Sequence, residues 1–219
     1  MPETPGLAPS DALSTLTSDC APRAAAGRAV VLGSTSRYRR ELLARLALPF
    51  EVEAPEVDET PQPAERPEAL ARRLALAKAR AVAARHPAAA VIGSDQVADL
   101  DGEPLGKPGT HARAVEQLRR MQGRTVVFQT ALAVVCQATG FEQVDLAPVR
   151  VRFRTLSDLE IEAYLRAEQP YDCAGSAKSE GLGIALLESI DSDDPTALVG
   201  LPLIRTCRLL RAAGVRLIA

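Results

Sequence analysis

The chain has 219 residues, with 26 basic and 28 acidic side chains and a formal net charge of −2. Nothing in this balance indicates a basic surface for nucleic acid or a membrane-binding face, and no apolar run approaches the roughly 20 residues that cross a bilayer. The four cysteines form no CxxC pair, which argues against a zinc site or a disulfide scaffold and fits a reducing compartment. We therefore expect neither nucleic acid nor a membrane as a partner.

The first 28 residues differ in composition from the rest of the chain. They carry four prolines among small residues, without hydrophobic periodicity and without the basic and apolar regions of a signal peptide. We expect a disordered N-terminal extension over 1–28 and one folded domain over 29–219. A misassigned start codon is an alternative explanation for the extension.

A strand is predicted at residues 29–32, followed by a polar turn that opens a helix with Ser36 as its N-cap. The N–H groups and dipole of a helix N-terminus bind anions. Arg37, Arg39 and Arg40 are unfavourable in a first turn unless an anion lies nearby, and a guanidinium can hold a phosphate through two hydrogen bonds. The alternative is an ordinary capped helix with a basic first turn.

An acidic segment follows a short strand predicted at residues 50–54. Glu56, Asp58 and Glu59 lie within four residues, and in an extended segment Glu56 and Asp58 point to the same side. If these two carboxylates lay close to Asp95, each pair of carboxylates would repel by about 4 kcal/mol at about 4 Å and an effective dielectric constant of about 20. A divalent cation with oxygen ligands, Mg²⁺ or Mn²⁺, would remove this repulsion. A solvated acidic loop is the alternative.

Residues 68–85 form the clearest predicted helix, with Leu70 and Leu74 on its apolar face. Lys78 continues this row and therefore lies at the buried stripe or its border. The usual interpretation is a lysine with a buried stem and a solvated ammonium. The sharper hypothesis is an ammonium directed into a cleft that binds phosphate.

The apolar run at residues 89–92 is broken by Gly93 and predicts a buried strand. Asp95 would then lie just past the end of the strand, where open α/β sheets place their ligands. The Asp-Gly pair at 101–102 predicts a tight hairpin that brings Lys107 back toward Asp95. An acid and a lysine on a rigid turn suit a phosphorylated substrate, and a surface hairpin with a solvated ion pair is the alternative.

Beyond this hairpin, the sequence predicts a helix from the N-cap Thr110 to about Met121 and two long antiparallel strands at 125–136 and 143–153 around Gly140. A helix then runs from the capping box at Ser157 to about Arg166. The last predicted elements are a helix at 201–213 and an edge strand at 215–218. His86 is assigned no function, and His111 is expected to face solvent.

A glycine-rich loop at residues 173–183 allows close approach to a ligand and could present Lys178 and Glu180 to it. Its glycine spacing matches no known phosphate-binding loop, so a simple surface turn is the alternative.

Six stretches resemble the Maf family of nucleoside triphosphate pyrophosphatases, in the order expected of that family. They are LGSTSRYRRELL (32–43), APEVDET (54–60), IGSDQV (92–97), GKP (106–108), CAGSAKSEGLG (173–183) and DPTALVGLPL (194–203). The forms Gly-Ser-Asp-Gln and Lys-Ser-Glu-Gly resemble the branch that hydrolyses 7-methyl-GTP. In the branch that acts on dTTP and UTP, Thr follows the Asp and Gln stands in place of Glu180. Arg37 departs from the family, which usually has proline there.

The resemblance implies an α/β fold of the Maf/ITPase-like type, with a long mixed β-sheet flanked by helices and a cleft between two lobes. It implies that Asp95 is the catalytic proton acceptor for the attacking water, and that Glu56 and Asp95 bind a divalent metal cation, Mg²⁺ or Mn²⁺. It assigns substrate specificity to Tyr38, Gln96 and Glu180, and phosphate binding to Ser34, Arg39, Lys78 and Lys107.

The implied activity is hydrolysis of 7-methyl-GTP to 7-methyl-GMP and diphosphate, in the cytoplasm, as a means of clearing modified nucleotides, with a homodimer as the implied assembly. The carboxylate of Glu180 could accept hydrogen bonds from N1–H and N2–H₂ of guanine, each worth roughly 1.5–3 kcal/mol. Tyr38 could stack on the cationic methylated base, worth about 0.5–2 kcal/mol. The alternatives are a dTTP/UTP pyrophosphatase of the same family and a non-catalytic nucleotide-binding regulator of cell division.

Overall fold

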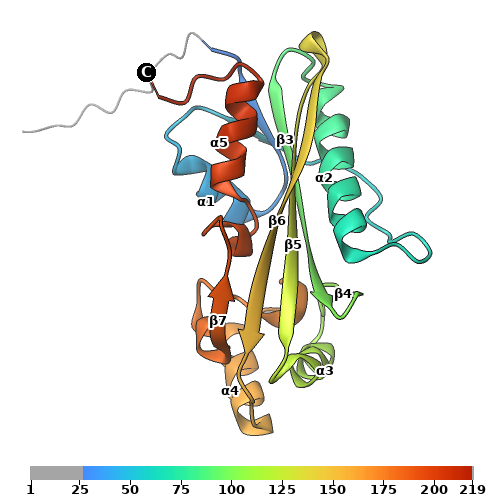
Figure 1. The fold of residues 1–219 in the computed structure, drawn as a ribbon, viewed down its shortest axis with the longest axis vertical. Helices are drawn as coiled ribbons and strands as arrows, with labels where there is room; N and C mark the ends of the chain where they lie inside the picture. The colour runs from blue at the N-terminus through green and yellow to red at the C-terminus, as the bar shows by residue number, and fades with distance from the viewer. Residues whose placement is uncertain (1–26, 219) are drawn as a thin grey trace, which may run out of the picture.

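The computed structural model describes residues 27–218 and contains a mixed seven-stranded sheet flanked by five α-helices (Figure 1). The strands are β1 (Val30–Gly33), β2 (Glu51–Glu53), β3 (Ala90–Leu100), β4 (Glu103–Leu105), β5 (Thr125–Cys136), β6 (Phe141–Phe153) and β7 (Leu187–Asp191). The helices are α1 (Arg37–Ala44), α2 (Pro67–Ala83), α3 (His111–Met121), α4 (Asp158–Glu168) and α5 (Leu203–Ala212). The predicted α/β fold with a long mixed sheet is confirmed, whereas nearly all of the predicted extension over 1–28 lies outside the described residues.

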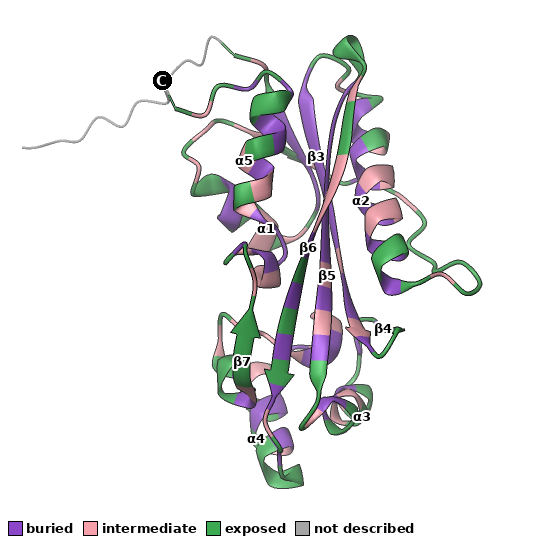
Figure 2. Ribbon diagram, viewed as in Figure 1, coloured by how far each residue is buried: buried purple, intermediate pink, exposed green. Residues whose placement is uncertain are grey.

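The sheet has the order β2-β1-β3-β5-β6-β7, with β4 pairing to β3. β1 is parallel to both β2 and β3, and the other pairs are antiparallel. Side chains alternate along β1 and β3: Val31 and Val91 pack against α2, while Leu32 and Ile92 pack beneath α1 and α5. Helices therefore cover both faces at this end of the sheet, as parallel strands require (Figure 2).

The opposite end of the sheet carries a second group of helices. There α3 and α4 pack on the far parts of β3, β5 and β6, around buried side chains such as Leu118, Phe128, Phe153 and Ile161. The two helix groups lie at opposite ends of the long strands, which run through both lobes (Figure 1). The two lobes are thus joined by continuous strands.

Several local predictions are confirmed by the hydrogen bonds at the ends of the elements. Ser36 accepts a bond from the N–H of Arg39, and Thr110 caps α3 in the same way. Ser157 and Glu160 form the predicted capping box. The turn between β3 and β4 has positive φ at both Asp101 and Gly102, as the Asp-Gly pair predicts.

The prediction that Asp95 lies just past the end of a strand is wrong, because β3 continues through it to Leu100. The predicted strand ended at Gly93, but this glycine does not interrupt the ladder. A Cβ atom at Gly93 would lie 2.2 Å from the carbonyl oxygen of Ala75 and 2.5 Å from the N atom of Ala79. Gly93 is therefore a point of close packing between β3 and α2.

Two further expectations differ from the structure. Residues 215–218 are not a strand; the N–H of Val215 closes α5 on the carbonyl of Leu210, and Val215 packs into the core. The edge strand beyond β6 is instead β7, which is mostly exposed and lacks a hydrophobic pattern that could predict it. His111 is half-buried rather than solvent-facing, since its ring bonds to Tyr171 and Glu162.

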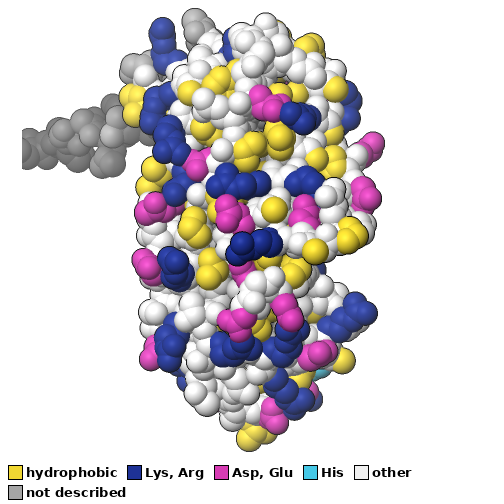
Figure 3. Space-filling model, turned by 45° about the vertical axis from the view of Figure 1, so that its right-hand side comes forward, with side chains coloured by type: hydrophobic (Ala, Val, Ile, Leu, Met, Phe, Trp, Pro, Cys, Tyr) yellow, Lys and Arg dark blue, Asp and Glu magenta, His cyan; other side chains and the backbone are white. Residues whose placement is uncertain are grey.

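Within residues 27–218, the structure has no helix long and apolar enough to cross a membrane. On the face seen in Figure 3, basic and acidic side chains of the described residues are interspersed, as the nearly balanced composition predicts.

Candidate active site

A cleft of about 940 Å³ opens beside the middle of β3. The ladder between β1 and β3 ends at the pair Gly33–Gly93, and the ladder between β3 and β4 begins at Ala98–Leu105. Residues 94–97 of β3 therefore lie in the interval between these two neighbouring strands. Asp95, Gln96 and Val97 line the cleft at this point.

All nine residues predicted from the sequence to form the site line this one cleft. They are Ser34, Tyr38, Arg39, Glu56, Lys78, Asp95, Gln96, Lys107 and Glu180. They come from segments far apart in the chain, and the fold brings them together. Their individual roles remain predictions.

Lys78 and Asp95 form an ion pair at the cleft. Asp95 follows Val91 and Gly93 on the face of β3 that packs against α2, so its side chain meets Lys78 of that helix. Lys78 Nζ lies 2.7 Å from Asp95 Oδ1, and both residues are buried, with 5% and 7% exposure. The hypothesis of a lysine directed into a cleft describes Lys78 better than a solvated ammonium does.

The acidic segment does not adopt the extended conformation assumed from its sequence. Glu56 has φ of 34°, and the carboxylate of Asp58 accepts the N–H of Thr60 at 2.9 Å instead of facing the cleft. Glu59, a residue given no role from the sequence, places Oε1 2.6 Å from Lys78 Nζ. Partial burial acts to raise the pKa of Glu59, but the hydrogen bond and charge of Lys78 outweigh it and lower the pKa. Only the fold distinguishes Glu59 from its acidic neighbours.

Arg39 of α1 also lines the cleft. Its Nε donates to the carbonyl of Gly200 at 2.9 Å, and its Nη1 lies 3.4 Å from the hydroxyl of Ser34. Burial lowers the pKa of Arg39, and the negative charges of Asp95 and Glu59 offset part of that effect. The guanidinium is therefore held in place before any substrate binds, facing the same cleft as the acids.

Gln96 points to the sheet face opposite Asp95, because it is the next residue on β3. Its amide nitrogen lies within 3.0 Å of the carbonyl oxygens of Ala197 and Leu198 and 2.8 Å from Thr130 Oγ1. These acceptors orient the amide, with the nitrogen toward the turn that follows β7.

The glycine-rich loop packs on the far part of β3, where a Cβ atom at Gly175 would lie 3.3 Å from Ala98 Cβ. A Cβ atom at Gly183 would lie 2.5 Å from the carbonyl oxygen of Lys178, so this glycine lets the loop fold back on itself. Glu180 is exposed and lines the cleft, whereas the ammonium of Lys178 pairs with Glu168. Burial raises the pKa of the neighbouring Cys173 thiol to about 12, so this thiol stays protonated.

Tyr38 is partly covered by its neighbour. The guanidinium carbon of Arg37 lies 4.7 Å from the ring centroid of Tyr38, and Arg37 Nη2 donates to the Tyr38 hydroxyl at 2.6 Å. In this structure the guanidinium of Arg37 thus occupies one approach to the Tyr38 ring. Residue 37 is also the position where this chain departs from the proline typical of the family.

The donors for a metal are few. Within residues 27–218, no group of three or more His, Cys, Asp or Glu side chains is arranged to hold a metal ion by itself. Mg²⁺ usually binds through one or two carboxylates together with substrate phosphates. The carboxylates of Asp95, Glu56 and Glu59 fit a cation that arrives with a polyphosphate, and they do not form a cage for a resident one.

The cleft and its charged walls are those of a protein that binds a phosphorylated small molecule, and the chain belongs to the Maf-like protein family, whose model matches residues 29–213. It is 71% identical over 191 residues to the 7-methyl-GTP pyrophosphatase of Albidiferax ferrireducens, covering 87% of this chain and 96% of that one. It is 73% identical over 192 residues to the 7-methyl-GTP pyrophosphatase of a Polaromonas species, covering 88% of each chain. The protein of the same name from Cupriavidus metallidurans is 57% identical over 186 residues, covering 85% of this chain and 94% of that one.

Proposed function

We propose that this protein is a nucleoside triphosphate pyrophosphatase that hydrolyses 7-methyl-GTP to 7-methyl-GMP and diphosphate. The observation that carries the proposal is the buried Lys78–Asp95 pair at a cleft that Arg39 and Lys107 also line. Relatives that share more than half of their residues with this chain bear the name of that activity. The rest of the cleft supplies groups suited to each part of such a substrate.

The reaction needs a nucleophile at the α-phosphorus and a stabilised leaving group. Asp95 accepts a proton from a water molecule, whose oxygen forms a new bond to the α-phosphorus. The bond from that phosphorus to the oxygen bridging to the β-phosphorus breaks, and diphosphate leaves with the electron pair. Lys78, Lys107 and Arg39 neutralise the charge that gathers on the leaving diphosphate.

The base is recognised at the other end of the cleft. Glu180 is exposed to the cleft and, as a carboxylate, accepts hydrogen bonds from the N1–H and N2–H₂ groups of guanine. Tyr38 stacks on the methylated base, whose positive charge favours an aromatic face. This requires Arg37 to leave the ring or the base to approach the other face.

A divalent cation, Mg²⁺ or Mn²⁺, is part of the proposal. Asp95 and Glu56, with Glu59 as a further oxygen donor, would hold such a cation, which would supply charge neutralisation of the triphosphate. Lys78 already neutralises Asp95 and Glu59 in part, so the cation and the triphosphate are expected to bind together.

We further propose that the enzyme acts in the cytoplasm, clears modified nucleotides and forms a homodimer. The cysteines Cys136, Cys173 and Cys207 are free in the described part of the chain, which is consistent with a reducing compartment. Size-exclusion chromatography with light scattering measures the assembly directly.

The proposal is tested by incubating the purified chain with single nucleotides and measuring diphosphate release, with Mg²⁺, with Mn²⁺ and with a chelator. We expect 7-methyl-GTP to be hydrolysed faster than UTP, dTTP or GTP. Equal or faster hydrolysis of UTP or dTTP would reject the base specificity. Tight binding of 7-methyl-GTP without hydrolysis under any metal condition would favour the non-catalytic regulator.

A further inference from the structure

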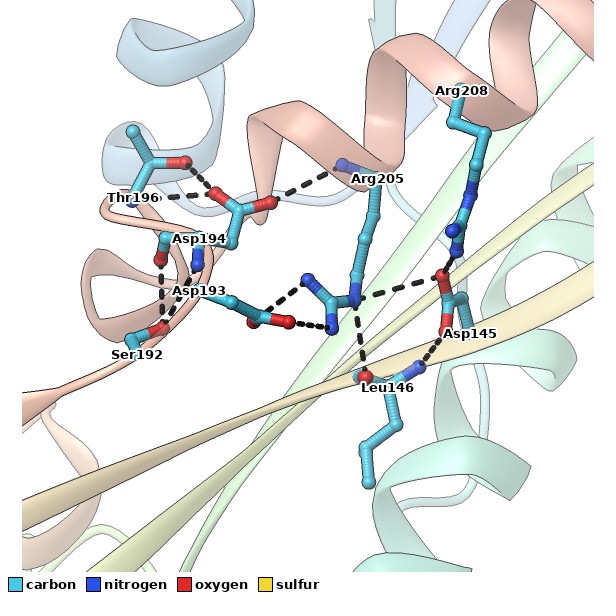
Figure 4. A network of polar contacts seen from close by, with 8 residues as sticks. All are labelled: Asp145, Leu146, Ser192, Asp193, Asp194, Thr196, Arg205 and Arg208. Atoms are coloured by element: carbon cyan, nitrogen blue, oxygen red, sulfur yellow. Dashed lines mark hydrogen bonds and ion pairs between the residues drawn. The ribbon is translucent and has the colours of Figure 1, made fainter.

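A buried acid supports the turn that faces the cleft from beyond β7. Asp194 is fully buried, and its Oδ2 accepts the N–H of Arg205 in the first turn of α5 at 3.2 Å. Its Oδ1 accepts a hydrogen bond from the hydroxyl of Thr196 at 3.0 Å. The oxygen of the same hydroxyl accepts the N–H of Leu203 at 2.8 Å. Pro202 is the N-cap residue of α5 and provides no side-chain cap. Asp194 and Thr196 therefore satisfy the first N–H groups of this helix from outside it. Figure 4 shows the contacts of Asp194 with Thr196 and with the backbone N atom of Arg205.

The adjacent acid, Asp193, contacts the side chain of Arg205 and not its backbone N–H. Its two carboxylate oxygens each lie 3.0 Å from a guanidinium nitrogen of Arg205, and its side chain is 71% exposed. The guanidinium also donates to the carbonyl of Leu146 on β6 at 3.1 Å (Figure 4). Asp193 thus pairs with the side chain of Arg205 from an exposed position, whereas Asp194 holds the backbone of α5 and the turn before it.

The same turn supplies the carbonyl groups that hold two cleft residues. The carbonyl of Gly200 accepts from Arg39 Nε at 2.9 Å and from the hydroxyl of Ser94 at 3.0 Å. The carbonyls of Ala197 and Leu198 both accept from the amide of Gln96. Gly200 has φ of 120°, a conformation that only glycine adopts without strain.

We propose that Asp194 is a positioning residue for the active site. Through Thr196 and the first turn of α5 it sets the turn at 195–200, whose carbonyl oxygens place Arg39 on the phosphates and orient Gln96 near the base. Asp194 itself does not line the cleft. The inference rests on the proposed function, because that function assigns phosphate binding to Arg39 and substrate specificity to Gln96.

The central test compares Asp194→Asn with Asp193→Asn, two isosteric changes at neighbouring residues that both bond to Arg205. For Asp194→Asn we expect the KM for 7-methyl-GTP and the dissociation constant for diphosphate, measured by calorimetry, to rise about tenfold. The preference for 7-methyl-GTP over UTP should fall as well, since Gln96 loses its orientation. Asp193→Asn should change these constants by no more than about twofold.

A second pair of variants addresses the hydroxyl of Thr196. Thr196→Val keeps the shape of the side chain without its hydroxyl and should reproduce the weaker diphosphate binding of Asp194→Asn. Thr196→Ser keeps the hydroxyl and should restore binding to within about twofold of the parent protein. This pair also carries the test if Asp194→Asn does not fold.

A purely structural role predicts different behaviour. The variants would then have lower melting temperatures and smaller active fractions, while KM, the diphosphate dissociation constant and the substrate preference stay unchanged, and that result overturns the inference. Unfolding of both Asp194→Asn and Thr196→Val overturns it too. The proposed function fails separately, if the parent protein hydrolyses no triphosphate.

Discussion

The ammonium of Lys78 lies 2.7 Å from a carboxylate oxygen of Asp95 and 2.6 Å from one of Glu59. One buried cation thus joins two acids from distant segments at the cleft. We expect a bound polyphosphate to compete for this ammonium, because phosphate oxygens are equally good partners for it. We expect a shift of Lys78 toward the phosphates to free the carboxylate oxygens of Asp95 for contact with a water molecule.

Asp95→Asn removes the proposed proton acceptor while keeping the shape of the side chain. We expect diphosphate release to fall by about a factor of 10²–10⁴, the usual contribution of a general base. Asp158→Asn is the matched control, since Asp158 is exposed at the start of α4 and pairs with Arg119 away from the cleft. Activity of Asp95→Asn close to that of Asp158→Asn, in a folded protein, would rule out this role.

Lys78→Met tests how the buried pair contributes to the free energy of unfolding. Removing one partner of a buried ion pair leaves an uncompensated charge and typically costs about 3–5 kcal/mol. We expect a loss of this order in urea denaturation, and a partial recovery in the double variant Lys78→Met with Asp95→Asn. Lys107→Met removes an exposed cation of the same cleft and should cost less than about 0.5 kcal/mol. An equal loss for the two lysines would contradict this account of the pair.

Glu180→Gln tests base recognition. A glutamine offers one donor and one acceptor, so it cannot accept both N–H groups of guanine. The ratio of kcat/KM for 7-methyl-GTP to that for UTP should fall about tenfold or more. Glu188→Gln, at an exposed acid of β7 that pairs with Arg152, is the control. A proportional change for both substrates would mean that Glu180 does not read the base.

The pH dependence of stability has a defined sign at Glu160. Hydrogen bonds from the backbone and hydroxyl of Ser157, and then from Arg154, lower the pKa of Glu160 from 4.5 to about 2. A lowered pKa stabilises the fold above the unfolded value, and this contribution is lost as pH falls through the folded value. The difference in melting temperature between the parent protein and Glu160→Gln should therefore be largest near neutral pH and shrink between pH 4.5 and about 2. A difference that stays constant across this range would contradict the capping interaction.

Much of the fold follows from local sequence signals, since the N-caps at Ser36, Thr110 and Ser157 appear as predicted. The continuation of β3 through Gly93 could not be predicted, because it depends on how closely α2 approaches that glycine. The exposed strand β7 carries no periodic pattern that distinguishes it from a loop.

The candidate site, too, was predicted only in part from the sequence. Residues that resemble family motifs, such as Arg39 and Lys107, line one cleft. The choice among neighbouring acids was not available from the sequence, because the positive φ of Glu56 changes which side chains face inward. The positioning role of Asp194 could not be predicted from the sequence either, because Asp194 acts through the backbone of α5 and not through a contact with the cleft.

Hydrolysis in water enriched in the heavy isotope of oxygen tests the central claim most directly. If Asp95 activates a water molecule for attack on the α-phosphorus, mass spectrometry should find the label in 7-methyl-GMP and none in diphosphate. Label in diphosphate, or release of orthophosphate in its place, would show that the cleft directs water to a different phosphorus and would contradict the account.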